Sequence, residues 1–556
     1  MIAFIMRILN SLCFFFTKSE AQSNVVFIHF TQSLKLYKPF CISGIVCKTF
    51  SLMEQTRLSA LTMQDIIFEA IISSAMKIIA INKYILFFTL LYYIESIDYT
   101  RENWNTPKGL FMVKPLKFYL SLLLARAAFT GIKLFSKSSG TSFAGKMVLK
   151  FYPDFLKNCK SYIKRNMITV TGTNGKTTTS GMISHIIETD GYSVIHNLKG
   201  ANMLTGVANV FALNLAPFKR FDYAVIESDE AYLQKLYDYV NSDYLVVTNL
   251  FRDQLDRYGE LATTAGFIKN AIDKNPDLKL VLNADDPLVS TFDKTGNAVF
   301  YGIESVEYDC SYQHESNAPS ENFNCACGNP LQYTKHFMAQ EGHYFCTKCG
   351  YKRPECSYSA DVKVYPEFSE LKVKHGENIY NFKVYLSGLY NAYNALAAIA
   401  VSLEAGFSHV TIQDALNTYK SIFGRTETRM IKGHKALIQL IKNPTGASEV
   451  LKTVDLNSNI VIAINDNYAD GRDISWLWDS DFEQLKDSKK LVITSGVRAN
   501  DMATRLKYAG IPQSQILVEP SVKRAIEIAA SSEDKEETIT ILPSYTALLK
   551  IAKMKF

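Results

Sequence analysis

The amino-acid sequence predicts an α/β protein that contains a P-loop ATPase domain, a cysteine-rich insertion and a C-terminal α/β domain. Three observations support this fold class. A β-branched run at 168–171 leads into a glycine turn and a helix, in the segment ITVTGTNGKTTTS. Further strand-like runs alternate with helical stretches as far as residue 549. Two cysteine pairs interrupt this alternation. Alternating strands and helices are typical of βαβ units, whose ligands bind at the carboxyl ends of the strands.

Composition limits the class of protein. The 556 residues suffice for two to four domains, and 47% of them are hydrophobic. The formal net charge of +6 is small for this length. It does not indicate a nucleic-acid partner, although it is compatible with an anionic membrane surface. Six of the ten cysteines lie between 310 and 356, a pattern closer to metal binding than to a secreted disulfide framework. We therefore expect a cytoplasmic protein.

Residues 1–111 differ from the rest of the chain, because they are rich in Phe, Ile and Tyr and carry no chemical motif. Residues 1–16 resemble a signal peptide without a convincing cleavage site. The apolar run at 84–94 is about half as long as a membrane span. Two interpretations stay open: a membrane segment, or extra translated sequence upstream of a functional start at Met112. The pattern favours the second.

The segment 112–165 is predicted to be helical and basic. Its apolar face has Lys117, Arg126 and Lys133 on the other side. Such a helix either lies on a membrane surface or packs on its own domain, and packing is the commoner arrangement.

The glycine turn has the residues that a phosphate site needs. Backbone N–H groups and the helix N-terminus form a cradle for phosphate oxygens. Lys176 supplies a positive charge for the outer phosphates, and Thr177 a hydroxyl for magnesium. The spacing is shorter than in the general P-loop, since Val170 stands where the first glycine would be. The predicted ATP-binding residues are Gly172, Thr173, Asn174, Gly175, Lys176, Thr177 and Thr178.

Three later strands are predicted to end in acidic residues, within 222–230, 243–259 and 278–287. Glu227 stands at the end of the first, where a magnesium carboxylate is needed beside the P-loop. An acid at a strand end is more often simply solvated, but three such ends beside a P-loop favour a functional role.

Several motifs together resemble the Mur ligase family, which makes amide bonds by activating a carboxylate as an acyl phosphate. They are TGTNGKTTTS, ESDE, TNLFRDQLDRYGE, LNADDP, LSGLYNAYNALAA (386–398) and FGRTETR (423–429). The resemblance covers 166–430. It implies that Lys176 and Thr177 bind the phosphates and magnesium, and that Glu227 is a magnesium ligand.

By the same resemblance Asn391 lies against adenine, and Arg425 near the ribose or phosphates. One position departs from the family pattern. Gln254 stands where many members carry a metal-binding histidine, so a second metal site lacks its usual ligand. We expect the central ATP-binding domain at 166–428 and the C-terminal, Rossmann-like domain at 429–556.

An insertion is predicted at 305–360. It contains Cys325-Ala-Cys327-Gly and Cys346-Thr-Lys-Cys349-Gly, which are typical of a zinc ribbon holding a structural zinc ion through four thiolates. The first pair is irregular, because Asn324 stands where the first cysteine of a CxxCG knuckle would be. Cys310 and Cys356 are reserve ligands. The alternative is a ribbon without metal.

The C-terminal segments KNPTGASEVL (442–451) and NDNYADGRDISWLWD (465–479) resemble one branch of the family, the ligase subunits of lipid II isoglutaminyl synthase. The glutaminase partner of that branch is GatD. The resemblance implies that ATP activates the α-carboxylate of D-glutamate in the lipid II stem peptide, and that ammonia from the partner converts it to D-isoglutamine during peptidoglycan biosynthesis. A lipid-linked substrate implies peripheral contact with the inner face of the plasma membrane.

The branch also implies that an aspartate of this chain completes the partner's Cys–His pair. The candidates are Asp466, Asp470 and Asp473. Asp466 is favoured because it follows the predicted strand directly, and Asp470 is second; a turn or capping role is the alternative for both. Two other functions stay open: a folylpolyglutamate synthase-like ligase that joins an amino acid, and a non-catalytic ATP-binding regulatory subunit.

Overall fold

The computed structural model describes residues 116–135, 142–197, 201–251, 261–309, 323–365, 367–420, 425–532, 534 and 536–555. The predictions for residues 1–111, Met112, Gln254 and Cys310 therefore lie outside the described residues.

The described part of the central domain is built on a sheet of nine strands, in the order β11-β10-β9-β6-β5-β4-β1-β3-β2. Neighbouring strands from β2 to β9 in this order run parallel, and β10 runs antiparallel to both β9 and β11. The mostly parallel sheet predicted from the alternating pattern is confirmed. The strands are β1 (Met167–Thr171), β2 (Val194–His196), β3 (Tyr223–Glu227), β4 (Tyr244–Val247), β5 (Lys279–Asn283), β6 (Val299–Tyr308), β9 (Tyr358–Val364), β10 (Ser369–His375) and β11 (Asn378–Val384).

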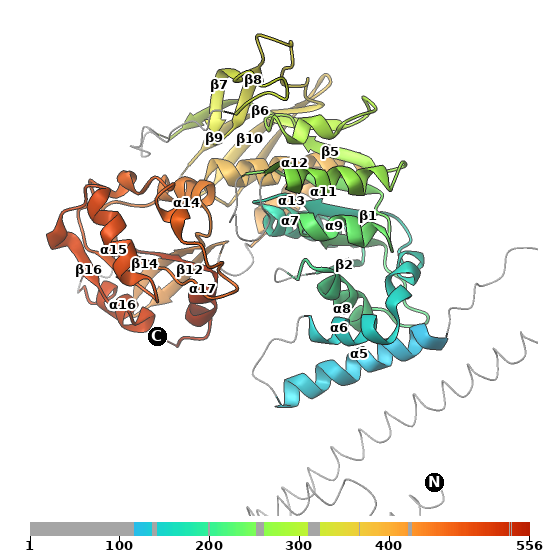
Figure 1. Ribbon diagram of the computed structural model, residues 1–556, viewed down its shortest axis with the longest axis horizontal. Helices are drawn as coiled ribbons and strands as arrows, with labels where there is room; N and C mark the ends of the chain where they lie inside the picture. Colours follow the sequence, from blue (N-terminus) through green and yellow to red (C-terminus); the bar gives the residue numbers. More distant parts are fainter. Residues whose placement is uncertain are drawn as a thin grey trace, which may run out of the picture. The chain divides into compact units, whose positions relative to one another are not determined.

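Helices cover both faces of this sheet (Figure 1). Ile168 and Val170 of β1 pack into one core, and Met167 packs into the other, because successive strand residues point to opposite faces. All five residues of β1 are buried, which explains why its sequence is continuously apolar or β-branched. The first core holds α7 (Lys176–Thr189), α12 (Leu389–Glu404) and α13 (His409–Thr418). The second holds α8 (Leu204–Asn214), α9 (Glu230–Tyr237) and α11 (Leu261–Asp273).

The insertion lies between β6 and β9 in the sequence. It folds as an antiparallel hairpin of β7 (Gln332–Met338) and β8 (Glu341–Phe345), flanked by the two cysteine pairs. The hairpin has its own small core, which includes Leu331, Tyr344 and two of the cysteines. Its tip is a tight turn in which Ala339 has a positive φ of 48°.

The C-terminal domain contains a second sheet, with the order β12-β13-β17-β14-β15-β16. All its pairs are parallel except β12–β13. The domain boundary expected between 428 and 429 falls inside β12, because Arg425 already pairs with Gln439 of β13. The strands are β12 (Arg425–Ile431), β13 (His434–Gln439), β14 (Asn459–Ala463), β15 (Val492–Ser495), β16 (Ile516–Val518) and β17 (Ile539–Pro543). The helices are α14 (Pro444–Leu451), α15 (Ala499–Tyr508), α16 (Val522–Ala529) and α17 (Tyr545–Ala552).

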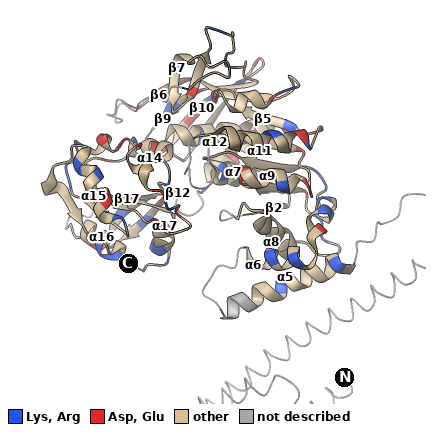
Figure 2. Cartoon of the chain, viewed as in Figure 1, with Lys and Arg blue, Asp and Glu red and all other residues tan. Residues whose placement is uncertain are grey.

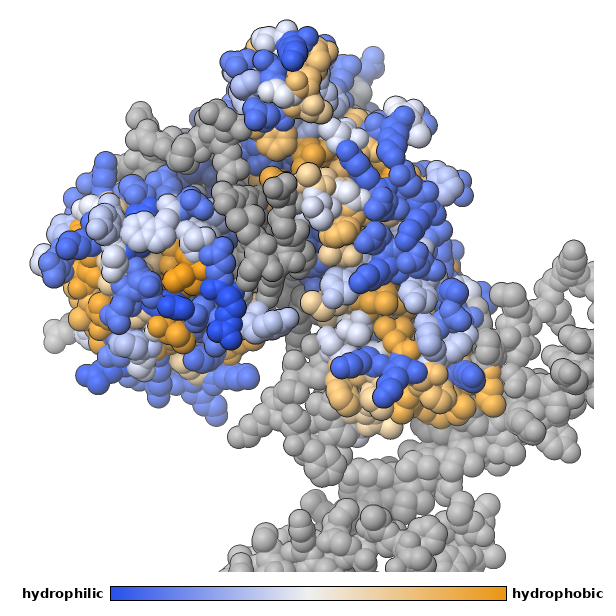
Figure 3. Space-filling model, viewed as in Figure 1, coloured by the Kyte–Doolittle hydropathy of each residue, from blue (hydrophilic) through white to orange (hydrophobic). Residues whose placement is uncertain are grey.

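Two helices precede the central sheet, α5 (Leu116–Phe135) and α6 (Phe143–Phe151). Helix α6 packs closely on α8, since a Cβ at Gly145 would lie 1.8 Å from the Thr205 carbonyl oxygen. Figure 2 shows Lys and Arg along both helices, and Figure 3 shows apolar residues gathered over the same region. Among the described residues, no helix is both long and apolar enough to cross a membrane.

Candidate nucleotide and metal sites

The turn after β1 takes its shape from two glycines. Gly172 has a φ of 126°, and a Cβ there would lie 2.2 Å from the Thr248 hydroxyl oxygen. Gly175 caps α7 with a φ of 84°, and a Cβ there would lie 1.9 Å from Asn394 Oδ1. Both positions combine a left-handed backbone with a close neighbour, which only glycine accommodates. The turn therefore ends at a helix N-terminus, as predicted for a phosphate site.

The segment after β4 fixes this turn. Asn249 accepts two backbone hydrogen bonds from it: its Oδ1 from Asn174 N at 2.8 Å, and its carbonyl from Thr173 N at 2.9 Å. The hydroxyl of Thr248 donates to the carbonyl of Asn174 at 2.7 Å, and Phe251 N donates to Thr173 Oγ1 at 3.1 Å. Residues 248–251 thus hold the phosphate-binding turn along its length. The sequence showed the TNLF motif but not this role.

Lys176 is buried and folds back over its own turn. Its Nζ donates to the carbonyl of Gly172, to the carbonyl of Thr173 at 3.2 Å and to Glu230 Oε1 at 3.1 Å. Burial raises the pKa of Glu230, and the charge of Lys176 opposes that rise. Glu230 begins α9 three residues after Glu227, but nothing in the motif ESDE specifies that this acid pairs with Lys176.

Two buried oxygen atoms beside the turn fit a magnesium ion. Thr177 Oγ1 and Glu227 Oε2 have no hydrogen-bond partner among the described residues. Glu227 ends β3 next to Val170 of β1, and its other oxygen accepts from Asn202 Nδ2 at 3.2 Å. Hydroxyl and carboxylate oxygens are the ligands that Mg²⁺ takes beside phosphates. Buried, unpaired oxygens of this kind are otherwise costly.

The predicted adenine residue, Asn391, lies in the first turn of α12 and is 3% exposed. Its Nδ2 donates to the carbonyl of Ser387 at 2.7 Å, and its Oδ1 accepts from Asn394 Nδ2 at 3.4 Å. Asn394 in turn lies against Gly175, so α12 is linked to the phosphate-binding turn. The side chain of Arg425 lies outside the described residues.

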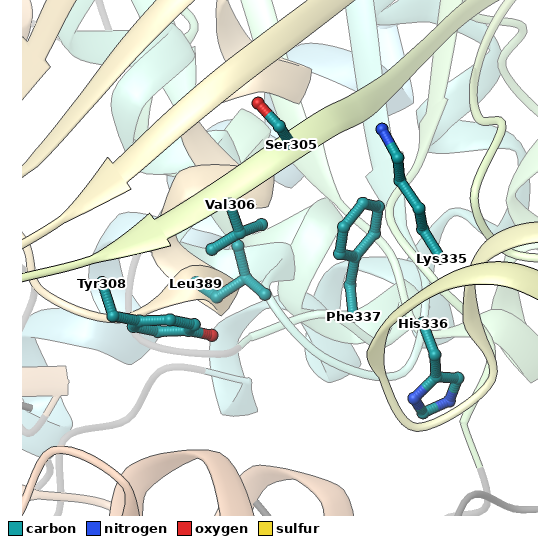
Figure 4. A pocket seen from close by; sticks show the side chains of 7 residues that line it. All are labelled: Ser305, Val306, Tyr308, Lys335, His336, Phe337 and Leu389. Atoms are coloured by element: carbon teal, nitrogen blue, oxygen red, sulfur yellow. The ribbon is translucent and has the colours of Figure 1, made fainter. Parts of the chain in front are cut away.

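A pocket of about 410 Å³ lies between the insertion and the start of α12 (Figure 4). In this view Val306 and Leu389 lie between the rings of Tyr308 and Phe337. Leu389 stands two residues before Asn391. The insertion therefore borders a cavity next to the helix that the sequence assigned to nucleotide binding. Its lining residues are Ser305, Val306, Tyr308, Lys335, His336, Phe337 and Leu389.

The four predicted zinc ligands come together. The Sγ atoms of Cys325 and Cys349 lie 3.4 Å apart, those of Cys327 and Cys346 lie 3.6 Å apart, and all four ligand atoms fall within 4.8 Å of one another. Tetrahedral zinc with Zn–S bonds of about 2.3 Å places its sulfurs about 3.8 Å apart, which these positions fit. Backbone N–H groups of Cys349 and Lys348 lower the pKa of the Cys346 thiol. At Cys325 the backbone N–H of Cys327 acts in the same direction, but burial and hydrogen bonds to the other thiols outweigh it and raise the pKa. The reserve ligand Cys356 does not join this cluster.

The candidate aspartates differ in how they are held. Asp466 lies three residues beyond the end of β14, not directly after it as expected, and its Oδ2 accepts from Arg498 Nη2 at 2.6 Å. Asp470 is 8% exposed and accepts from the backbone and hydroxyl of Thr546, so it holds the loop to α17. Asp473 accepts from Ser475 N at 2.8 Å within a local turn.

The C-terminal domain reaches the phosphate-binding turn through Asn443. This residue caps α14 by accepting from Gly446 N at 2.9 Å. Its Nδ2 donates to Asn174 Oδ1 at 3.0 Å. The sequence indicated a turn before a helix at this position, but not the contact with Asn174.

Comparisons with known proteins identify the family of this chain. Residues 170–402 match the Mur ligase middle domain, and residues 440–548 match the MurT ligase C-terminal domain. The chain is 33% identical over 445 residues to the lipid II isoglutaminyl synthase (glutamine-hydrolyzing) subunit MurT of Streptococcus pneumoniae, which covers 79% of this chain and 97% of that protein. It is 35% identical over 415 residues to the same subunit of Staphylococcus aureus, covering 74% and 91%.

Solved structures share the fold. A pseudomurein peptide ligase type C from Methanothermus fervidus superposes with a TM-score of 0.56 at 24% identity, covering 73% of this chain and 84% of that one. The folylpolyglutamate synthase of Mycobacterium tuberculosis, solved with ADP and AMPPCP, superposes with a TM-score of 0.51 at 15% identity, covering 78% and 99%. The predicted α/β ligase fold is therefore confirmed.

Proposed function

The chain belongs to the MurT family of lipid II isoglutaminyl synthase subunits, and on this premise we propose the reaction and the residues that carry it. ATP transfers its γ-phosphate to the α-carboxylate of D-glutamate in the lipid II stem peptide. Ammonia then attacks the acyl phosphate, phosphate leaves, and the nitrogen loses a proton to give the amide of D-isoglutamine. A carboxylate is a poor electrophile, so the phosphate supplies the leaving group that amide formation needs.

The observation that carries this proposal is the phosphate-binding turn with its two unpartnered oxygens, Thr177 Oγ1 and Glu227 Oε2. Backbone N–H groups at the start of α7 bind the phosphates, and Lys176 neutralises charge on the transferred group. Thr177 and Glu227 hold magnesium, which supplies further charge stabilisation when bound. Asn391 and Arg425 orient the nucleoside, as proposed from the family resemblance. Thr178 is buried in the first turn of α7 and completes the phosphate-binding turn.

We assign the ammonia source to a separate, GatD-like glutaminase subunit that forms a heterodimer with this chain. Asp466 is the proposed orienting carboxylate for the partner's histidine, because Arg498 holds its position and its side chain stays partly exposed, at 13%. Asp470 is the second candidate, and its two bonds to Thr546 favour a structural role. Exposed aromatic rings on the same domain suit a protein interface: Tyr468 is 86% exposed, Tyr508 74% and Trp478 55%.

We propose a structural zinc ion at Cys325, Cys327, Cys346 and Cys349. The close approach of the four sulfur atoms supports it. A closed site with four thiolates leaves no open position for substrate, so this zinc stabilises the insertion and takes no part in the chemistry.

We also propose peripheral contact with the inner face of the plasma membrane through α6. Phe143, Met147 and Phe151 share one face of this helix and are 51%, 36% and 45% exposed. Lys146 and Lys150 are exposed on the same helix, and the segment from 116 to 151 contains no Asp or Glu. A basic and apolar helix face of this kind suits an anionic lipid surface, where the lipid-linked substrate resides.

The test is amidation of purified lipid II with ATP, magnesium and ammonium, followed by mass spectrometry of the product. We expect the amide of the stem-peptide glutamate, and no product from Lys176→Ala. The matched control Lys164→Ala, at an exposed lysine, should retain activity. In a parallel mixture with an amino acid in place of ammonium, ligation of that amino acid without amidation in the first mixture would replace this function by that of an amino-acid ligase. Absence of ATP turnover in the complete mixture would leave a regulatory subunit.

A further inference from the structure

The tip of the cysteine-rich hairpin is buried in the central domain rather than exposed. Gln340 is 1% exposed and Glu341 is fully buried. Burial of two polar residues at a hairpin tip is costly unless they form hydrogen bonds. Gln340 Nε2 and Glu341 Oε1 form such bonds, which show what the tip is packed against, while Gln340 Oε1 and Glu341 Oε2 have no partner among the described residues.

Gln340 holds the segment that fixes the phosphate-binding turn. Its Nε2 donates to the carbonyl of Leu250 at 2.6 Å and lies 3.3 Å from Asp286 Oδ2. The same Asp286 oxygen accepts from Leu250 N at 2.8 Å. The backbone N–H and the backbone carbonyl of Leu250 are thus both held by hydrogen bonds. Leu250 lies between Asn249 and Phe251, which bond directly to the turn.

Glu341 reaches the same segment through a second route. Asn283 Nδ2 donates to Glu341 Oε1 at 2.8 Å and to the carbonyl of Thr248 at 3.0 Å. The hydroxyl of Thr248 donates in turn to the carbonyl of Asn174. Two independent chains of hydrogen bonds therefore connect the hairpin tip with the phosphate-binding turn.

The other end of the hairpin adjoins the cysteine cluster. Strand β8 runs from Glu341 to Phe345, and Cys346 follows directly. Tyr344 of β8 and Tyr351, which follows the second cysteine pair, both bond to Ser290. Arg353, further along the chain, pairs with the buried Asp285 at 2.5 Å. The hairpin tip and the segment that follows β8 are thus both fixed to the central domain.

We propose that Gln340 is a positioning residue for nucleotide binding, which holds the phosphate-binding turn in its binding conformation through residues 248–251. This inference rests on the proposed function and deepens it. The insertion, which the ATPase core does not need for its sheet, then contributes to ATP affinity without touching the nucleotide. Its effect is on the binding of ATP and not on the transfer step.

The test compares Gln340→Met with Gln332→Met in the full chain. Methionine keeps the length of glutamine but removes the amide, and Gln332 is an exposed glutamine on the same hairpin. The dissociation constant of a fluorescent ATP analogue is measured by titration, together with KM for ATP and kcat in the ammonium reaction. We expect Gln340→Met, which loses the hydrogen bonds to Leu250 and Asp286, to raise the dissociation constant and KM at least about fivefold, with kcat within about twofold of wild type. Gln332→Met should bind as wild type.

Hydrogen exchange provides a readout that general loss of stability would not reproduce. In Gln340→Met the amides of Thr173 and Asn174 should exchange faster, while those of β1 keep their protection. Wild-type affinity in folded Gln340→Met, or an equal loss in both variants, would overturn the inference. Should Gln340→Met not fold, Tyr333→Phe removes the hydroxyl that donates to the Gln340 carbonyl at 2.9 Å. About a twofold rise is expected there, and wild-type affinity in that variant would overturn the inference equally.

Nucleotide affinity is measured without lipid or ammonia. The experiments therefore distinguish a failure of the positioning role from a failure of the proposed function. A wild-type chain that binds ATP but forms no amide would contradict the proposed function alone. Wild-type affinity in Gln340→Met would contradict the positioning role alone.

Discussion

The side-chain amide of Asn443 donates to Asn174 Oδ1 across 3.0 Å, although 269 residues separate the two in the sequence. Asn443 caps the first helix of the C-terminal domain, and Asn174 belongs to the phosphate-binding turn. This hydrogen bond joins the two domains that, in our proposal, bind the partner and ATP. The acyl phosphate and the ammonia must meet, so this contact lies where the two halves of the reaction have to be aligned.

Asn443→Ser tests this contact separately from the helix cap. Serine is a good capping residue, so α14 should keep its stability, but serine lacks the amide that donates to Asn174. We expect KM for ATP to rise about threefold to tenfold in the ammonium reaction, with a melting temperature close to wild type. Asn443→Ala loses the cap as well and should melt lower. Equal kinetics of Asn443→Ser and wild type would show that the contact has no role in catalysis.

Asp466→Asn should impair amidation with glutamine but not amidation with added ammonium. Asparagine keeps the shape of the side chain but cannot stabilise a charged histidine in the partner. Glutamine-dependent amidation by the heterodimer should fall by at least about 100-fold, while amidation with added ammonium stays near wild type. Asp473→Asn in the same loop is the matched control and should retain both activities. Loss of both reactions, or of neither, in Asp466→Asn would contradict the assignment.

The parts of this protein that local sequence could predict are those that local geometry determines. The β-branched run of β1, the glycines of the turn and Glu227 at a strand end are set by periodicity and by backbone conformations available over a few residues. The cysteine pairs likewise carry their ligand spacing in the sequence. These elements lie where the sequence predicted.

The remaining contacts depend on tertiary pairing and left no local signal. Glu230 reaches Lys176 only because α9 starts beside the turn, and Gln340 reaches Leu250 only because the hairpin folds back over the end of β5. Asn394 lies next to Gly175, although their positions in the sequence differ by 219 (394 − 175). The sequence did not indicate the burial of Asp470 either, because its partner groups belong to Thr546, at the start of a helix far along the chain.

Zinc should bind at one equivalent per chain and be lost with its ligands. Cys346→Ser should abolish stoichiometric zinc, measured by elemental analysis of the purified protein, and lower the melting temperature by several degrees. Cys356→Ala is the control, since Cys356 lies outside the cluster and should leave the zinc content at one equivalent. A strong chelator should reproduce the effect of Cys346→Ser. Wild-type protein without zinc, with reactive Cys346 and Cys349, would contradict the site.

His196 should make stability depend on pH. Burial lowers its pKa from 6.5 to about 4, and its Nε2 lies 3.1 Å from the hydroxyl of Ser180 on α7. The unfolded chain therefore binds a proton between about pH 6.5 and pH 4 that the folded chain does not, and stability is lost as the pH falls through this window. We expect this residue to account for about 3 kcal/mol of the loss in unfolding free energy between pH 7 and pH 4. Urea denaturation should show a loss smaller by that amount in His196→Gln, and an equal loss in both proteins would contradict the prediction.

The exposed face of α6 should bind anionic membranes through its lysines as well as its apolar residues. Replacing Lys146 and Lys150 by Gln removes two positive charges from a face that also carries Phe143, Met147 and Phe151. Each lysine near an anionic surface contributes about 1 kcal/mol, so the double variant should bind vesicles containing about one third anionic lipid roughly 30-fold more weakly. Co-sedimentation of the full chain at two salt concentrations measures this, and the salt dependence should also decrease.

The matched control for this experiment replaces two exposed lysines of the C-terminal domain, Lys523 and Lys550, by Gln. This variant has the same net charge as the α6 variant and retains residues 1–111, so any general effect of charge or of the N-terminal extension is shared. It should bind vesicles as wild type does, because its substitutions leave the basic and apolar face of α6 intact. If both double variants lose affinity equally, long-range charge and not α6 attracts the protein to the membrane. If neither does, the face of α6 serves another partner.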